Sequence, residues 1–233
     1  MYLIRYEVKR TVLILLAIMV IMPLHAQHFS YERVDFKKVR SAVAKRKSAF
    51  YYPVLFERYR NNDTTLSREE FRYLYYGYTF QDEYRPYAIH DTDSLASNLM
   101  MKDNLTREDF SDILGTCREI LELHPFSTRT LLTSAIACSR IGNTKEATLY
   151  YYKYHSILSS ILSSGDGATE QSAWSVILIS DEYELIRSLE FIPSGKQKMM
   201  AKSLCDFIYV MANDYGIEGF YFDISRPFAR GFN

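Results

Sequence analysis

Residues 127–154, STRTLLTSAIACSRIGNTKEATLYYYKY, decide the fold. Their apolar positions recur at helical spacing: Leu131, Leu132, Ala135 and Cys138 in the first half, and Ala147, Tyr150, Tyr151 and Tyr154 in the second. Gly142 and Asn143, between these two sets, form a cluster typical of a tight turn. Two helices joined by so short a turn must run antiparallel, so the stretch predicts a helical hairpin.

The hairpin resembles a tetratricopeptide repeat. Ala135, Gly142, Ala147 and Tyr151 occupy its small, turn, small and aromatic positions. Small residues let paired helices approach closely, and the aromatic ring fills the space above them. Tyr154 and Ser159 depart from the pattern, where a small residue and a proline are expected. The resemblance implies one or two degenerate repeats.

Two matching segments on the amino-terminal side predict further helix starts. Residues 66–71 (LSREEF) and 105–110 (LTREDF) each place a Ser or Thr cap three residues before an acidic side chain, the pattern of a capping box. Each segment also has apolar residues at the two positions of a hydrophobic staple. Upstream, Pro53 stands at a helix-starting position, and a modest stripe at Phe36, Val39 and Val43 predicts a short helix.

The carboxy-terminal part has a different pattern. Residues 207–210 (FIYV) and 219–224 (GFYFDI) flank a turn cluster at 213–216, which predicts an antiparallel hairpin, with a third strand near 198–202. Residues 174–179 are consistent with a buried strand or a helix end, and 181–189 predict a short helix. We therefore expect an α+β fold. Helical hairpins over 27–165 precede a small antiparallel sheet within 166–233, and both regions share one core.

Residues 1–26 have the order of a cleaved signal peptide. Basic residues precede an apolar run over 12–24, and Ala26 supplies a small residue at the cleavage point before Gln27. An uncleaved membrane anchor is the alternative, but the run is too short to span a bilayer. We expect a periplasmic or secreted protein that has no membrane span after cleavage.

Charge and cysteine content narrow the classes of function. Cleavage would remove three of the 28 basic and one of the 28 acidic residues, which leaves 25 against 27. This balance argues against a nucleic-acid partner. Cys117, Cys138 and Cys205 are too few for a disulfide framework. We expect buried free thiols, and a disulfide bridge between Cys117 and Cys138 is the alternative.

Four strings in order resemble a known family: residues 50–53 (FYYP), 74–78 (LYYGY), 161–167 (ILSSGDG) and 215–219 (YGIEG). The chain is similar along almost its whole mature length to exported Bacteroidetes proteins classed as domain of unknown function 4919. The resemblance implies a periplasmic or cell-surface setting and carries over neither an activity nor a catalytic residue.

Tyrosine is the unusual feature of the composition, with 20 residues. Two clusters stand out, at 73–78 and 150–154, and successive tyrosines on a helix point about 100° apart. Some can therefore pack in the core between the helical repeats while others face solvent, where tyrosine is a good anchor for peptides and sugars. Tyr73, Tyr76, Tyr150 and Tyr152 are the candidate contact residues.

Short Asp-Ser/Thr patterns resemble the acceptor sites of exported Bacteroidetes glycoproteins. They make Thr64 and Ser94 candidate glycosylation sites, with turn capping as the alternative.

The sequence contains no known catalytic, metal or cofactor motif, so none of these sites is assigned. We expect a non-enzymatic module that binds an unidentified protein, peptide or glycan. One alternative is an envelope hydrolase that uses acidic residues, such as Asp91 with Asp93 or Asp181 with Glu182. The other is a small-ligand carrier with a cavity under the sheet.

Overall fold

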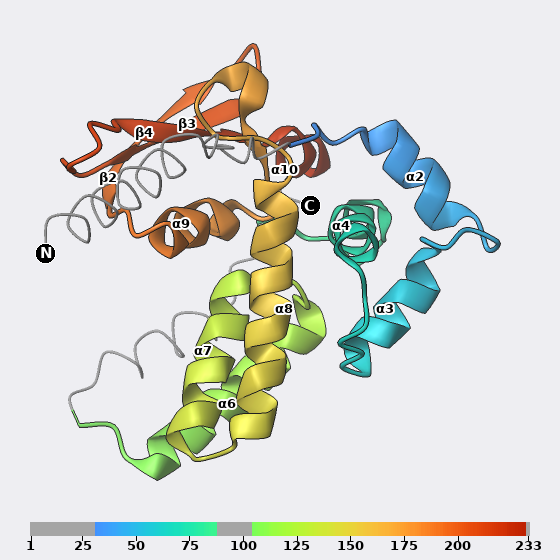
Figure 1. The fold of residues 1–233 in the computed structure, drawn as a ribbon, viewed down its shortest axis with the longest axis vertical. Coiled ribbons are helices and arrows are strands. Elements are labelled where there is room, and N and C mark those ends of the chain that lie inside the picture. Colours follow the sequence, from blue (N-terminus) through green and yellow to red (C-terminus); the bar gives the residue numbers. More distant parts are fainter. Residues whose placement is uncertain (1–30, 88–103, 232–233) are drawn as a thin grey trace, which may run out of the picture. The chain divides into compact units, whose positions relative to one another are not determined.

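Helices α6 (Arg107–Leu123), α7 (Thr128–Arg140) and α8 (Thr144–Leu162) form two successive hairpins in the computed structural model (Figure 1). Helix α7 contacts both α6 and α8. Gly142 makes the turn before α8 with a φ of +84°, a conformation that glycine adopts without strain. Ala135 and Ala147 are buried in α7 and α8. The predicted hairpin is confirmed, whereas its relation to the tetratricopeptide repeat stays a prediction.

The structure describes residues 31–87 and 104–231. The predicted signal peptide over 1–26, its cleavage point at Ala26 and Gln27, and the candidate site at Ser94 lie outside these residues. So do Asp91 and Asp93, one of the acidic pairs considered for a hydrolase.

The amino-terminal helices surround α4 (Arg68–Gly77), which contacts α2 (Phe36–Ala44), α3 (Tyr52–Arg60) and α8. Both predicted helix starts are confirmed as complete capping boxes, Ser67 with Glu70 at α4 and Thr106 with Asp109 at α6. A short 3₁₀ turn, η1 (Tyr78–Phe80), extends α4.

The sheet has the order β1-β4-β3-β2. Strands β3 (Cys205–Val210) and β4 (Gly219–Asp223) form the predicted hairpin, and β2 (Pro193–Met200) pairs antiparallel with β3 as the third strand. The expected α+β fold, with helices followed by a small carboxy-terminal sheet, is confirmed, and the sheet is mixed rather than antiparallel throughout. Strand β1 (Trp174–Ser175) pairs parallel with β4, because the chain leaves β1, makes three further elements and returns to its side as β4.

The segment after β1 resolves the ambiguity over residues 174–179. Trp174 and Ser175 form a strand, and Val176 to Leu178 continue as buried chain. Helix α9 (Ile179–Ser188) then begins two residues before its predicted start. Two short helices that were not predicted, η2 (Glu170–Ser172) and α10 (Ser225–Arg230), flank β1 and β4 in the sequence.

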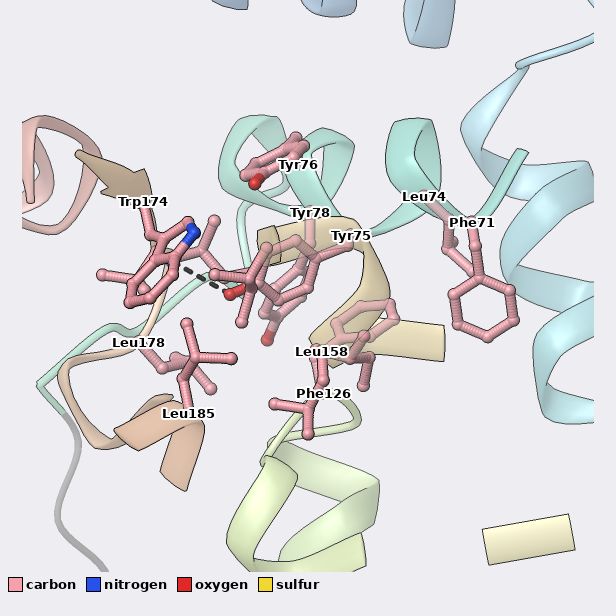
Figure 2. Close-up of a cluster of buried hydrophobic side chains, with 14 of the residues drawn as sticks. Phe71, Leu74, Tyr75, Tyr76, Tyr78, Phe126, Leu158, Trp174, Leu178 and Leu185 are labelled. Atoms are coloured by element: carbon pink, nitrogen blue, oxygen red, sulfur yellow. Dashed lines mark hydrogen bonds between the residues drawn. The ribbon is translucent and has the colours of Figure 1, made fainter. Parts of the chain in front are cut away.

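One hydrophobic core joins the helices to the sheet. Phe71 and Tyr75 of α4, Phe126 before α7, and Trp174 and Leu185 from the carboxy-terminal part belong to the same buried cluster (Figure 2). The described residues, 31–87 and 104–231, belong to one compact unit. The helical region and the carboxy-terminal region therefore stabilise each other by burying a common apolar surface.

A smaller cluster lies between α6, α7 and α8 and includes Ile113, Cys117 and Cys138. Cys117, Cys138 and Cys205 are buried thiols, as expected. Among the described residues, no helix has the length and apolar character that a membrane span requires.

Candidate functional site

The first tyrosine cluster is part of the core. Tyr73 is 7% exposed, and its ring stacks on Phe50 with the centroids 3.9 Å apart. Tyr76 is fully buried, and its hydroxyl lies within hydrogen-bonding distance of the carbonyls of Ser160 and Ser175, at 3.2 and 3.0 Å. The expectation that Tyr73 and Tyr76 contact a partner is therefore corrected, because α4 is surrounded by other helices and these two rings fill the space between them.

The two candidate residues of the second tyrosine cluster, Tyr150 and Tyr152, lie in different surroundings. Tyr152 is half-buried, packs edge-on against Phe71 at 5.7 Å and donates a hydrogen bond to the carbonyl of Leu66. Tyr150, also half-buried, points instead into a groove bordered by α3, α6 and α8. Of the four candidate tyrosines, only Tyr150 lines this groove.

The groove has a volume of about 370 Å³. Its walls combine aromatic, aliphatic and charged side chains: Phe56, Tyr59, Arg60, Asn62, Arg118, Leu121, Glu122, Pro125, Leu131, Glu146, Leu149, Tyr150 and Lys153. Helices that are far apart in the sequence supply these residues, so the groove exists only once the core has formed. Its volume is within the usual range for a ligand site, about 300–1,000 Å³.

Two ion pairs in the groove wall join different helices. Arg118 of α6 places one guanidinium nitrogen 2.7 and 2.9 Å from the two carboxylate oxygens of Glu146 of α8. Arg60 of α3 lies 3.4 Å from Glu122 of α6. Glu122 and Glu146, the two carboxylates among the described residues of the wall, thus each have a cationic partner.

Lys153 brings a third cation into the wall. Its ammonium lies 4.4 Å from the centroid of the Tyr59 ring, a cation–π contact. Burial lowers the pKa of Lys153 to about 8. Sequence reasoning missed this residue, although it stands between Tyr152 and Tyr154 in the aromatic run that was singled out.

The acidic pair considered for a hydrolase does not reach solvent. Asp181 and Glu182 are both fully buried. Asp181 accepts hydrogen bonds of 2.7 Å from the hydroxyls of Tyr75 and Thr128, while burial raises its pKa to about 7. Burial and the nearby Asp206 carboxyl raise the pKa of Glu182 well above its usual value, and neither of its carboxyl oxygens has a hydrogen-bond partner among the described residues. These two carboxyls cannot meet a substrate in this structure.

The candidate acceptor Thr64 is exposed in the turn before α4. Next to it, the Asp63 carboxylate accepts hydrogen bonds from the backbone amide and the hydroxyl of Thr65, and it pairs with Arg58. Turn capping therefore accounts for Asp63, and glycosylation of Thr64 stays a prediction. Among the described residues, no group of three or more His, Cys, Asp and Glu side chains is arranged to hold a metal ion.

Comparison with known proteins identifies the family. The profile of the domain of unknown function DUF4919 matches residues 37–230. The chain belongs to the DUF4919 family. The described residues that line the groove, from Phe56 to Lys153, all lie within this DUF4919 domain. Neither the search of curated proteins nor the search of solved structures found a match.

Proposed function

We propose that this DUF4919 protein is a non-enzymatic binding module that holds an extended peptide segment of a partner protein in the groove between α3, α6 and α8. The observation that carries the proposal is the groove wall, where Phe56, Tyr59 and Tyr150 line a cavity of about 370 Å³. Rigid aromatic side chains in a concave surface are typical anchors for a partner, because they lose little conformational entropy on contact.

The chemistry of the wall favours a peptide over a glycan. The Arg60–Glu122 and Arg118–Glu146 pairs offer hydrogen-bond donors and acceptors at the rim, where main-chain amides and carbonyls would meet them. Leu121, Leu131 and Leu149 add aliphatic surface that suits apolar side chains. An apolar centre with a polar rim is the common composition of protein–protein contacts.

Selection from a displayed library of random peptides tests the proposal. We expect the native protein to enrich peptides that no longer bind after Tyr150→Ala. Tyr151→Ala is the matched control, because Tyr151 is exposed one residue further on α8 and does not line the groove. Glu122→Trp blocks the groove from an exposed position on α6 and leaves the core intact, so loss of binding in that variant does not depend on misfolding.

Peptides that bind all three variants as well as the native protein would contradict the proposal. Binding of oligosaccharides in the groove, with no enrichment of peptides, would replace the peptide with a glycan as the ligand. Circular dichroism and thermal melts of each variant establish that the comparison is made between folded proteins.

We also propose that the protein is exported to the periplasm or the medium. Residues 1–26 contain basic residues, then an apolar run, then a small residue at the cleavage point, and this order supports export. Mass spectrometry of the protein isolated from cell fractions is expected to find a chain that begins at Gln27. A full-length chain in the cytoplasmic fraction would contradict export. The intact mass also tests modification at Thr64 or Ser94, which is excluded if the mass equals that of the bare chain.

A further inference from the structure

Lys153 is a half-buried cation that pairs with no carboxylate among the described residues. It takes part in none of the ion pairs that join described residues. Its ammonium lies over the face of Tyr59, 4.4 Å from the ring centroid. A cation–π contact replaces only part of the hydration that an ammonium loses on burial. Lys153 therefore retains the capacity to form a stronger interaction with an anion that enters the groove.

Positive charges outnumber negative charges among the described residues of the groove wall. Of the described residues, three cations line it, Arg60, Arg118 and Lys153, against two carboxylates, Glu122 and Glu146. Arg118 holds Glu146 with two contacts below 3 Å, and Arg60 lies beside Glu122. Arginines engage both of these carboxylates, so Lys153 carries the remaining positive charge of the described groove residues.

The surface beneath Lys153 is held in place. The Tyr59 hydroxyl donates a hydrogen bond of 2.5 Å to the carbonyl of Pro125, and the ring is 4% exposed. It packs against Phe126 at 5.1 Å and against Phe71 at 5.8 Å. A ring fixed in this way positions the ammonium above it. A preorganised cation binds an anion with a smaller entropic cost than a mobile surface lysine does.

We infer that Lys153 is the anchor for a carboxylate of the ligand, and that the ligand is a peptide with an acidic side chain flanked by apolar residues. The inference rests on the proposed peptide-binding function and specifies which peptides the groove takes. The acidic side chain meets the ammonium, while the flanking apolar side chains lie against Phe56 and Leu149. Charge complementarity of this kind contributes to specificity, and a charge-assisted hydrogen bond is stronger than a neutral one.

Two blocked tripeptides of matched size test the inference: leucine-glutamate-phenylalanine and leucine-glutamine-phenylalanine. Affinities are measured from the chemical-shift changes of groove residues on titration. We expect the glutamate peptide to bind the native protein about tenfold more tightly or better, as a charge-assisted hydrogen bond in a partly buried site requires. Lys153→Met should bind the two peptides equally.

Two further variants control for charge and for folding. Lys145→Met removes an exposed lysine from the same helix, outside the groove, and should keep the preference for glutamate. Lys153→Arg keeps the positive charge and should retain a preference that Lys153→Met loses. The amide spectrum of each variant shows whether the fold is intact.

Equal binding of the two tripeptides to the native protein would overturn the carboxylate anchor, but it would not contradict peptide binding in the groove. A preference that persists in Lys153→Met would also overturn it, because another cation would then hold the carboxylate. If the display selection enriches peptides without acidic residues, the anchor again fails and the groove function survives. If neither tripeptide binds and the selection enriches no peptides, both the carboxylate anchor and the proposed peptide-binding function fail.

Discussion

The hydroxyl of Tyr75 donates a hydrogen bond of 2.7 Å to the buried carboxylate of Asp181, which lies 106 residues further along the chain. The same hydroxyl oxygen accepts a hydrogen bond from the backbone amide of Ile177. Figure 2 shows Tyr75 among the core residues between Trp174 and Phe126. This contact ties α4 to the segment that begins α9, so it joins the helical and carboxy-terminal regions at one point.

Tyr75→Phe is expected to lower the free energy of unfolding by about 1–3 kcal/mol, because the Asp181 carboxyl and the Ile177 amide both lose a buried partner. Urea denaturation measures the change. Tyr215→Phe removes the same hydroxyl from a side chain that is 81% exposed, and it should change stability by less than about 0.5 kcal/mol. Equal effects in the two variants would show that the hydroxyl of Tyr75 contributes nothing.

Stability should fall as the pH rises from about 4 towards 7. The pKa of Asp181 is about 7 in the folded chain, and the pKa values of Glu182 and Asp206 are also raised by burial. In the unfolded chain these carboxyls ionise near their ordinary values, about 4. Between the two values the folded state binds more protons, so raising the pH favours unfolding. Urea midpoints measured from pH 4 to 8 test this, and a midpoint that rises throughout would contradict it.

Glu182→Met is expected to stabilise the protein at pH 8 by about 1–3 kcal/mol, because it removes buried carboxyl oxygens that have no hydrogen-bond partner among the described residues. The gain should be smaller at pH 5, where the raised pKa lets Glu182 keep its proton at little cost. Glu119→Met, at an exposed position on α6, is the control and should show no such pH dependence. A destabilised Glu182→Met at pH 8 would mean that the carboxylate is satisfied in solution.

Two glycines should respond in opposite directions to alanine. Gly167 has a φ of +69°, and a Cβ there would lie 2.6 Å from the Trp174 ring, so Gly167→Ala should cost about 2–4 kcal/mol. Gly115 lies in α6 with nothing within 4 Å of the added atom, and Gly115→Ala should stabilise by about 0.5–1 kcal/mol. Fluorescence of Trp174, the single tryptophan, follows both unfolding transitions. Similar shifts of the two midpoints would refute the contrast.

The three thiols should react slowly with Ellman's reagent in the folded protein. Cys117, Cys138 and Cys205 are buried, and burial raises the pKa of Cys138 to about 11. A neutral thiol is a poor nucleophile, so the reaction should reach three thiols per chain only in denaturant. Ser111→Cys, exposed on α6, supplies a fast-reacting reference. Rapid modification of the native thiols would show that the core opens readily.

Local patterns predicted most of the elements, because their causes are local. The capping boxes at Ser67 and Thr106 and the turn at Gly142 depend on residues a few positions apart. The β3–β4 hairpin was predicted for the same reason. The parallel pairing of β1 with β4 was not, since it joins residues 48 positions apart and depends on how α9 and β2 place the intervening chain.

The sequence by itself determined the family, the helical hairpins and the presence of a carboxy-terminal sheet, because matched strings, spacing and turn residues are properties of the chain in order. The tertiary structure decided which tyrosines are buried. Tyr76 and Tyr150 belong to equally aromatic runs, yet one fills the core and the other lines the groove. It also placed Lys153 of α8 over Tyr59 of α3. That contact depends on packing between helices far apart in the sequence, and no local pattern encodes it.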